Sequence, residues 1–120
     1  MKLTINKDIF QSYFIELRRG SLTLSVLGCL NKPYYGYSLL QTMQDIGIDI
    51  EANTLYPLLR RLETQGLLTS DWDTTDSRPR KYYTISTLGE SVYQELLKEF
   101  EKMNSNMTQI AQSRGEQNEK

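Results

Sequence analysis

The sequence contains no histidine and a single cysteine among 120 residues. It has no glycine-rich phosphate loop, no clustered metal ligands and no nucleophile beside an evident base, so the usual equipment of acid–base and covalent catalysis is missing. Cys29, within the apolar segment 26–30, can form neither a disulfide framework nor a metal cluster. We therefore expect no enzyme, no cofactor and no metal site, and we expect Cys29 to pack in the core.

Long apolar runs are also absent. No segment approaches the ~18 apolar residues of a membrane span, and residues 1–8 lack the continuous apolar core of a signal peptide. Together with the lone cysteine, these absences predict a soluble cytoplasmic protein with no membrane partner.

A strong charge of one sign is the third absence. The formal net charge is -1 and the pI is near 5.5, so bulk charge does not indicate a nucleic-acid partner. The segment 52–84 is only slightly positive, because five cations stand against four anions: Arg60, Arg61, Arg78, Arg80 and Lys81 against Glu63, Asp71, Asp73 and Asp76. Any affinity for DNA must come from the placement of these cations.

The first half of the chain has the periodicity of helices. Apolar residues at helical spacing predict an amphipathic helix over about 7–19, and a second stripe follows Gly20, with Ser21 as a possible N-cap. The two stripes predict either one kinked helix or two abutting helices. A third helix is expected from about Tyr37 to Ile46, ended by Gly47. The length suits one domain with a single core.

A fourth helix, starting near Ala52 or Asn53 and closed by Gly66, has four leucines on one face and polar residues on the other. A polar helix face with arginines suits the major groove of DNA, where side chains contact base edges and phosphates. We expect base contacts from five residues of its outward face and flank, which are Asn53, Thr54, Tyr56, Pro57 and Arg60. Taken alone, this face is more typical of a solvated surface with incidental arginines, and the wing that follows changes this interpretation.

Two segments rich in strand-forming residues follow, 67–72 and 81–85, separated by a polar loop. They predict a two-stranded wing, with Trp72 packed at its base and one of Tyr82 and Tyr83 facing inward. The cations on or near its tip suit contact with the DNA backbone, as does Arg61 of the preceding helix. The expected backbone contacts are Arg61, Arg78, Arg80 and Lys81.

The last helix, capped by Ser86 or Thr87, has apolar residues spaced as a heptad seam from Leu96 onward. A chain of this length has no other element to cover the stripe, so we expect a second copy to cover it. The dimerisation residues would be Leu96, Phe100, Met103, Met107 and Ile110. We expect the chain to divide into three parts. Residues 1–86 form a winged helix-turn-helix DNA-binding domain that includes the N-terminal helix, residues 87–110 form a dimerisation helix, and residues 111–120 form a flexible tail.

The ordered motifs resemble the PadR family of bacterial transcriptional regulators. They are 18–20 (Arg-Arg-Gly), 35–37 (Tyr-Gly-Tyr), 54–63 (beginning Thr-Leu-Tyr-Pro), 66–68 (Gly-Leu-Leu), Trp72 and 80–84 (Arg-Lys-Tyr-Tyr-Thr). The resemblance covers about residues 17–100 and implies a mainly α winged-helix repressor that binds double-stranded DNA as a homodimer on an inverted-repeat operator. Asn53 and Thr87 depart from the residues usual in the family at their positions.

The short C-terminal region resembles the family's small subset, some of whose members have a flat aromatic cavity for planar effectors at the dimer centre. Phe100 matches a cavity aromatic, and Phe10, Tyr13, Phe14 and Met103 are candidates to line the same space; ordinary dimer packing is the competing interpretation. The alternative function is a winged-helix module that binds a protein instead of DNA, which the acidic pI favours.

Overall fold

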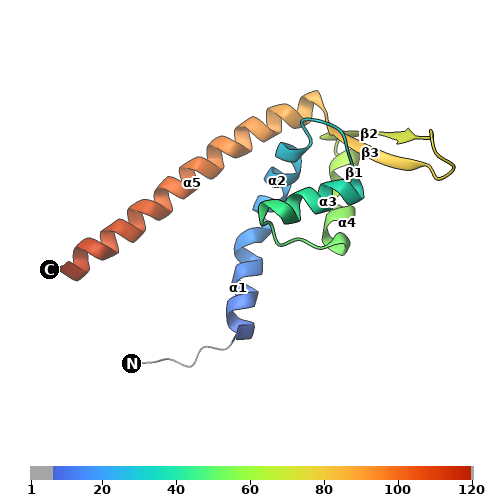
Figure 1. The fold of residues 1–120 in the computed structure, drawn as a ribbon. Coiled ribbons are helices and arrows are strands. Elements are labelled where there is room, and N and C mark those ends of the chain that lie inside the picture. Colours follow the sequence, from blue (N-terminus) through green and yellow to red (C-terminus); the bar gives the residue numbers. More distant parts are fainter. Residues whose placement is uncertain (1–6, 120) are drawn as a thin grey trace.

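The computed structural model describes residues 7–119, so residues 1–6 of the predicted domain and residue 120 of the predicted tail lie outside the described residues. Figure 1 shows a helical body from which a β-hairpin and one long helix project. The elements in order are α1 (Lys7–Arg19), α2 (Ser21–Cys29), β1 (Tyr34–Tyr35), α3 (Gly36–Ile46), α4 (Ala52–Thr64), β2 (Leu68–Asp73), β3 (Arg80–Ile85) and α5 (Thr87–Glu119). The predicted mainly α fold with a wing is confirmed.

The sheet has three antiparallel strands in the order β1-β3-β2, which corrects the predicted two-stranded wing. Tyr34 pairs with Tyr83 and Tyr35 with Tyr82, so β1 lies along the outer side of β3. A strand of two residues cannot display the alternation by which strands are identified in a sequence. The hairpin itself pairs from Leu68 opposite Ile85 to Asp73 opposite Arg80.

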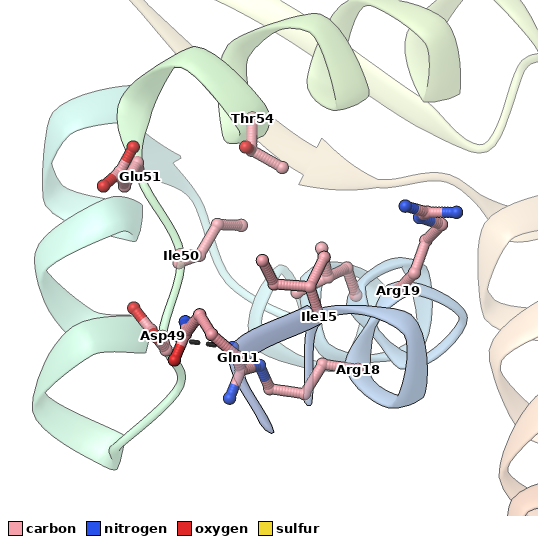
Figure 2. Close-up of a pocket in the computed structure, with 9 residues that line it drawn as sticks. Gln11, Ile15, Arg18, Arg19, Asp49, Ile50, Glu51 and Thr54 are labelled. Atoms are coloured by element: carbon pink, nitrogen blue, oxygen red, sulfur yellow. Dashed lines mark hydrogen bonds and ion pairs between the residues drawn. The ribbon is translucent and has the colours of Figure 1, made fainter. Parts of the chain in front are cut away.

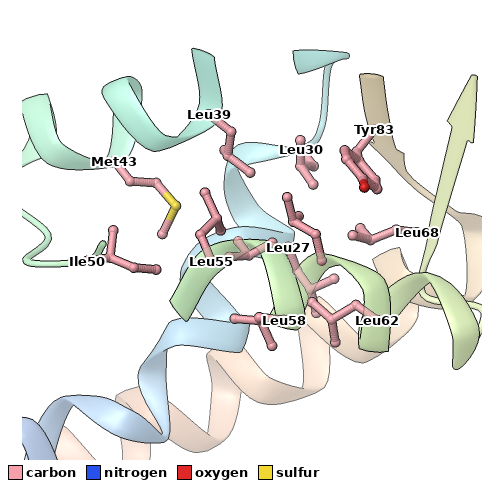
Figure 3. Packing of buried hydrophobic residues seen from close by; sticks show 12 residues of the cluster. Leu27, Leu30, Leu39, Met43, Ile50, Leu55, Leu58, Leu62, Leu68 and Tyr83 are labelled. Carbon is pink, nitrogen blue, oxygen red and sulfur yellow. The ribbon is translucent and has the colours of Figure 1, made fainter. Parts of the chain in front are cut away.

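The core lies where α2, α3 and α4 meet the inner face of the sheet (Figure 3). All four leucines predicted for the inner face of α4 are buried, and Leu39 and Met43 of α3 are fully so. Tyr83 is the inward tyrosine of β3, as the alternation predicts. The complete cluster is Val26, Leu27, Leu30, Leu39, Met43, Ile50, Leu55, Leu58, Leu59, Leu62, Leu68 and Tyr83.

The helix boundaries have identifiable chemical causes. Gly47 has a φ of 108° and ends α3 in the left-handed conformation that glycine tolerates. Ser86 caps α5, because its Oγ accepts the Gly89 N–H at 2.9 Å. Ser21 does not cap α2: its hydroxyl donates to the Arg18 carbonyl at 2.9 Å instead, so that prediction is wrong.

The long helix α5 gives the molecule its elongated shape, with extents of 67 × 33 × 22 Å. Its radius of gyration of 18.5 Å exceeds the ~14 Å expected for a compact chain of this size. The helix continues to Glu119, past the predicted end at residue 110, since extending a formed helix through polar residues needs no packing partner. Within residues 7–119, no helix combines the length and apolar character needed to cross a membrane.

Candidate nucleic-acid interface

Helix α4 presents a polar face on the side opposite its four buried leucines. Asn53, Thr54, Pro57, Arg60 and Arg61 are all exposed on it. The turn 47–51 joins α4 tightly to α3, and a helix-turn-helix results. Four of the five residues predicted for base contact therefore lie together on an accessible surface.

Tyr56, the fifth residue predicted for base contact, is half-buried and packs partly against the core. A Cβ added to Gly36 would lie 2.6 Å from its Cε1 atom, so the ring rests on the backbone at the start of α3. Glycine at position 36 thus allows α3 and α4 to approach closely. The ring of Tyr56 holds the two helices of the motif together.

The arginines of the wing differ in their surroundings. Arg78 is exposed in the loop between β2 and β3 and has no ion-pair partner among the side chains that the structure describes. Arg80 pairs with Asp76 of the same loop at 3.1 Å, and its guanidinium carbon lies 5.4 Å from the centre of the Tyr35 ring. Both contacts leave more than half of the Arg80 side chain exposed, at 56%. A phosphate can therefore reach either arginine.

Lys81 is held within the protein. Its Nζ lies 3.0 Å from Oε1 of Glu63, at the end of α4, and 5.2 Å from the centre of the Tyr83 ring. Glu63 Oε2 accepts a second hydrogen bond from the hydroxyl of Ser70. These hydrogen bonds, that of Ser70 first, lower the pKa of Glu63, and the Glu63 carboxylate raises the pKa of Lys81. The sequence did not indicate this contact, because its partners are far apart in the chain.

A second polar contact joins the outer strand to the wing. The Tyr35 hydroxyl donates a hydrogen bond to Asp73, which also accepts from the Thr75 hydroxyl at 2.7 Å and the Thr75 N–H at 3.0 Å. The hydrogen bond from Tyr35, followed by those from Thr75, lowers the pKa of Asp73 to about 2. The same hydrogen bond raises the pKa of Tyr35. Asp73 thereby ties β1, β2 and the loop together.

Trp72 does not pack at the base of the wing, contrary to the prediction. Its side chain is 61% exposed, on β2 directly opposite Lys81. The hairpin extends beyond the helical body (Figure 1), so the helices do not enclose its outer part. An aromatic surface on the wing is therefore accessible.

A cleft of about 400 Å³ lies between α1, the start of α2 and the turn that leads into α4 (Figure 2). Its floor includes Ile15 and Ile50, and Arg18 bridges it with an ion pair to Asp49 at 3.4 Å. Arg19 and Thr54 lie on its rim, away from that ion pair (Figure 2). Residues of the first helix and of the N-terminal end of α4 thus line the same cleft.

The residues predicted for dimerisation and effector binding lie on exposed helix faces. None of the residues of α1 is buried, and Phe10 stacks on Phe14 with ring centres 6.1 Å apart. The heptad residues of α5 are between 36% and 59% exposed. In Figure 1, α1 and α5 leave the body in different directions, and the predicted cavity residues are divided between these two helices.

A helix-turn-helix followed by a β-hairpin, with a polar second helix and cations on the hairpin, defines a winged-helix protein. The sequence profile of the transcriptional regulator PadR-like family matches residues 24–95. The chain belongs to this family.

Solved structures and curated relatives agree with this assignment. A PadR family transcriptional regulator from Eggerthella lenta is 47% identical and superposes with a TM-score of 0.82, covering 87% of this chain and 93% of that one. A PadR-like transcription factor from Bacteroides fragilis is 32% identical, with a TM-score of 0.69 over 82% of this chain and 98% of its own. A transcriptional regulator of Mycobacterium tuberculosis is 32% identical over 81 residues, which are 67% of this chain and 76% of that protein.

Proposed function

We propose that the protein is a homodimeric, sequence-specific DNA-binding regulator that represses transcription from an inverted-repeat operator. The observation that carries the proposal is the exposed polar face of α4 beside a wing with accessible arginines. Asn53, Thr54, Pro57 and Arg60 are suited to base edges in the major groove. Arg61, Arg78 and Arg80 are suited to phosphates, which carry most of the affinity but little of the specificity.

Dimerisation is supported by the uncovered apolar surfaces of α1 and α5. Large hydrophobic stripes on a small protein mark an interaction surface. A second copy, related by a two-fold axis, can cover both stripes at once and present two α4 helices together. Half-sites one or two helical turns apart, at multiples of about 34 Å, would then match the spacing of these helices.

Response to a planar effector is the finer part of the proposal. The rings of Phe10 and Phe14 are already stacked, and each is more than two fifths exposed. If α1 of one copy meets α5 of the other, these rings and Tyr13 come near Phe100 and Met103 and form an aromatic-lined site. Isothermal titration with planar cationic and phenolic compounds tests this; no heat from any of them would contradict it.

The experiment that tests DNA binding is selection of bound duplexes from a random pool, followed by footprinting and by titration at several salt concentrations. Binding should weaken steeply with salt, with a slope of about 0.9 per neutralised phosphate. The footprint should show two-fold symmetry. Failure to retain any duplex at low salt would overturn the proposal and favour a winged-helix module that binds a protein, in keeping with the net charge of -1.

A further inference from the structure

Glu63 of α4 makes polar contacts with both long strands of the wing. Ser70 of β2 donates to one of its carboxylate oxygens, and Lys81 of β3 lies 3.0 Å from the other. Ser70 pairs with Tyr83, and Trp72 pairs with Lys81, so Ser70 and Lys81 lie on the same inner face of the sheet. One carboxylate therefore connects the end of the helix to two adjacent strands.

The environment of this contact favours a persistent interaction. The Glu63 and Lys81 side chains are 30% and 31% exposed, less than the partners of the other ion pair of the wing, Arg80 and Asp76, at 56% and 68%. Charge-assisted hydrogen bonds of this kind are shorter and stronger than neutral ones. The Lys81 ammonium also lies over the ring of Tyr83, which is itself buried in the core.

We infer that Glu63 is a positioning residue for DNA binding, which fixes the wing relative to α4, and that Lys81 acts as its partner rather than as a phosphate ligand. This inference rests on the proposed DNA-binding function. In the proposed complex, α4 and the wing contact DNA at the same time. If the wing is already fixed relative to α4, less conformational entropy is lost on binding. Leu62 and Leu68 belong to the apolar core at the base of the hairpin, where Leu68 pairs with Ile85. Glu63 contacts the hairpin farther from its base.

The two possible roles of Lys81 predict opposite effects of one substitution. If Lys81 is a phosphate ligand that Glu63 merely neutralises, Glu63→Gln should strengthen DNA binding, because the lysine is freed and a negative charge is removed. If Glu63 positions the wing, the same substitution should weaken binding. The sign of the change distinguishes them.

The test measures fluorescence anisotropy of a labelled operator duplex with the full-length protein at three or more salt concentrations. Glu63→Gln and Lys81→Met should each weaken binding by about three- to tenfold, and the double variant should be no weaker than the singles, since they remove one shared contact. The salt slope should stay at the wild-type value in all three. Arg78→Ala is the matched control, and its slope should decrease by about 0.9.

A charge exchange separates positioning from a general loss of stability. The protein with both Glu63→Lys and Lys81→Glu should bind DNA more tightly than either single exchange. Circular dichroism at the assay temperature verifies that each variant is folded. If Glu63→Gln does not fold, Ser70→Ala replaces it and should weaken binding without changing the slope.

Tighter binding by Glu63→Gln, a slope reduced by Lys81→Met, or unchanged affinity in both would overturn the inference. A wild-type protein that binds no duplex would instead overturn the proposed function.

Discussion

Arg60 lies in the middle of the exposed face of α4, where a guanidinium can form a two-pronged contact with guanine. We predict that Arg60→Ala weakens operator binding by about 1–3 kcal/mol and relaxes the preference at one base position. Competition titrations with operators altered at single positions measure both effects. Thr64→Ala is the control, since its hydroxyl bonds within the helix to the Arg60 carbonyl at 2.9 Å. Equal affinity and unchanged base preference in Arg60→Ala would refute the role.

Asp73 makes the stability of the wing sensitive to acid. Its folded-state pKa is depressed from 3.8 to about 2, so the stabilisation is present above the unfolded pKa and is lost as the pH falls from about 4 towards 2. We predict that Asp73→Asn is less stable than wild type at pH 7 and that the difference shrinks below pH 3. Urea denaturation at several pH values measures this. The exposed Asp71 of the same strand supplies the control Asp71→Asn, which should change stability little. A pH-independent difference would contradict the assignment.

Single residues also mark the limit of inference from the sequence. The exposed positions of α4 follow from its 3.6-residue period, because four leucines fix which side faces the core. The Glu63 contact to Lys81 joins residues 18 positions apart, across a turn and a hairpin. No local rule pairs them, so the sequence predicts a role for Lys81 only from its charge and its position on the wing.

At the level of elements, the junction between the sheet and α5 depends on Gly89. A Cβ at this position would lie 2.1 Å from the Leu67 carbonyl oxygen and 2.8 Å from Ile85 Cγ1. We predict that Gly89→Ala destabilises the protein by about 1–3 kcal/mol, because backbone atoms must move. Thermal unfolding followed by circular dichroism measures this. Gly115→Ala is the matched control in the same helix, with nothing within 4 Å of the added atom. Equal unfolding midpoints would contradict the prediction.

The elements differ in how well the sequence specifies them. Helices α3 and α4 were placed within a residue or two, since each has a buried stripe and a glycine at or near its end. β1 was missed because its two residues pair only through the distant β3. The end of α5 was misplaced because polar residues give no periodic signal, although they extend a helix readily.

The whole molecule is organised around surfaces that one chain cannot cover. Its core closes around α2, α3, α4 and the sheet, while α1 and most of α5 extend from it. The heptad spacing predicted the stripe on α5, and its exposure agrees with that prediction. The orientation of the proposed second copy would depend on both surfaces together, and neither pattern alone predicts it. The cleft beside Arg18 is lined by residues of α1 and of the N-terminal end of α4, so in the proposed dimer a movement of α1 would change the surroundings of that end of α4.

Disruption of the α5 stripe should therefore remove dimerisation and tight DNA binding together. Phe100 belongs to this stripe and is 46% exposed, so Phe100→Glu would place a charge where a second copy is expected to pack. We predict a monomer by light scattering at micromolar concentration. Operator affinity should fall by at least about 100-fold, because one half-site then binds alone. Ser105→Glu, an exposed position on the opposite side of α5, should leave both unchanged. A dimeric Phe100→Glu, or a monomer that binds as tightly as wild type, would show that the stripe is not the interface.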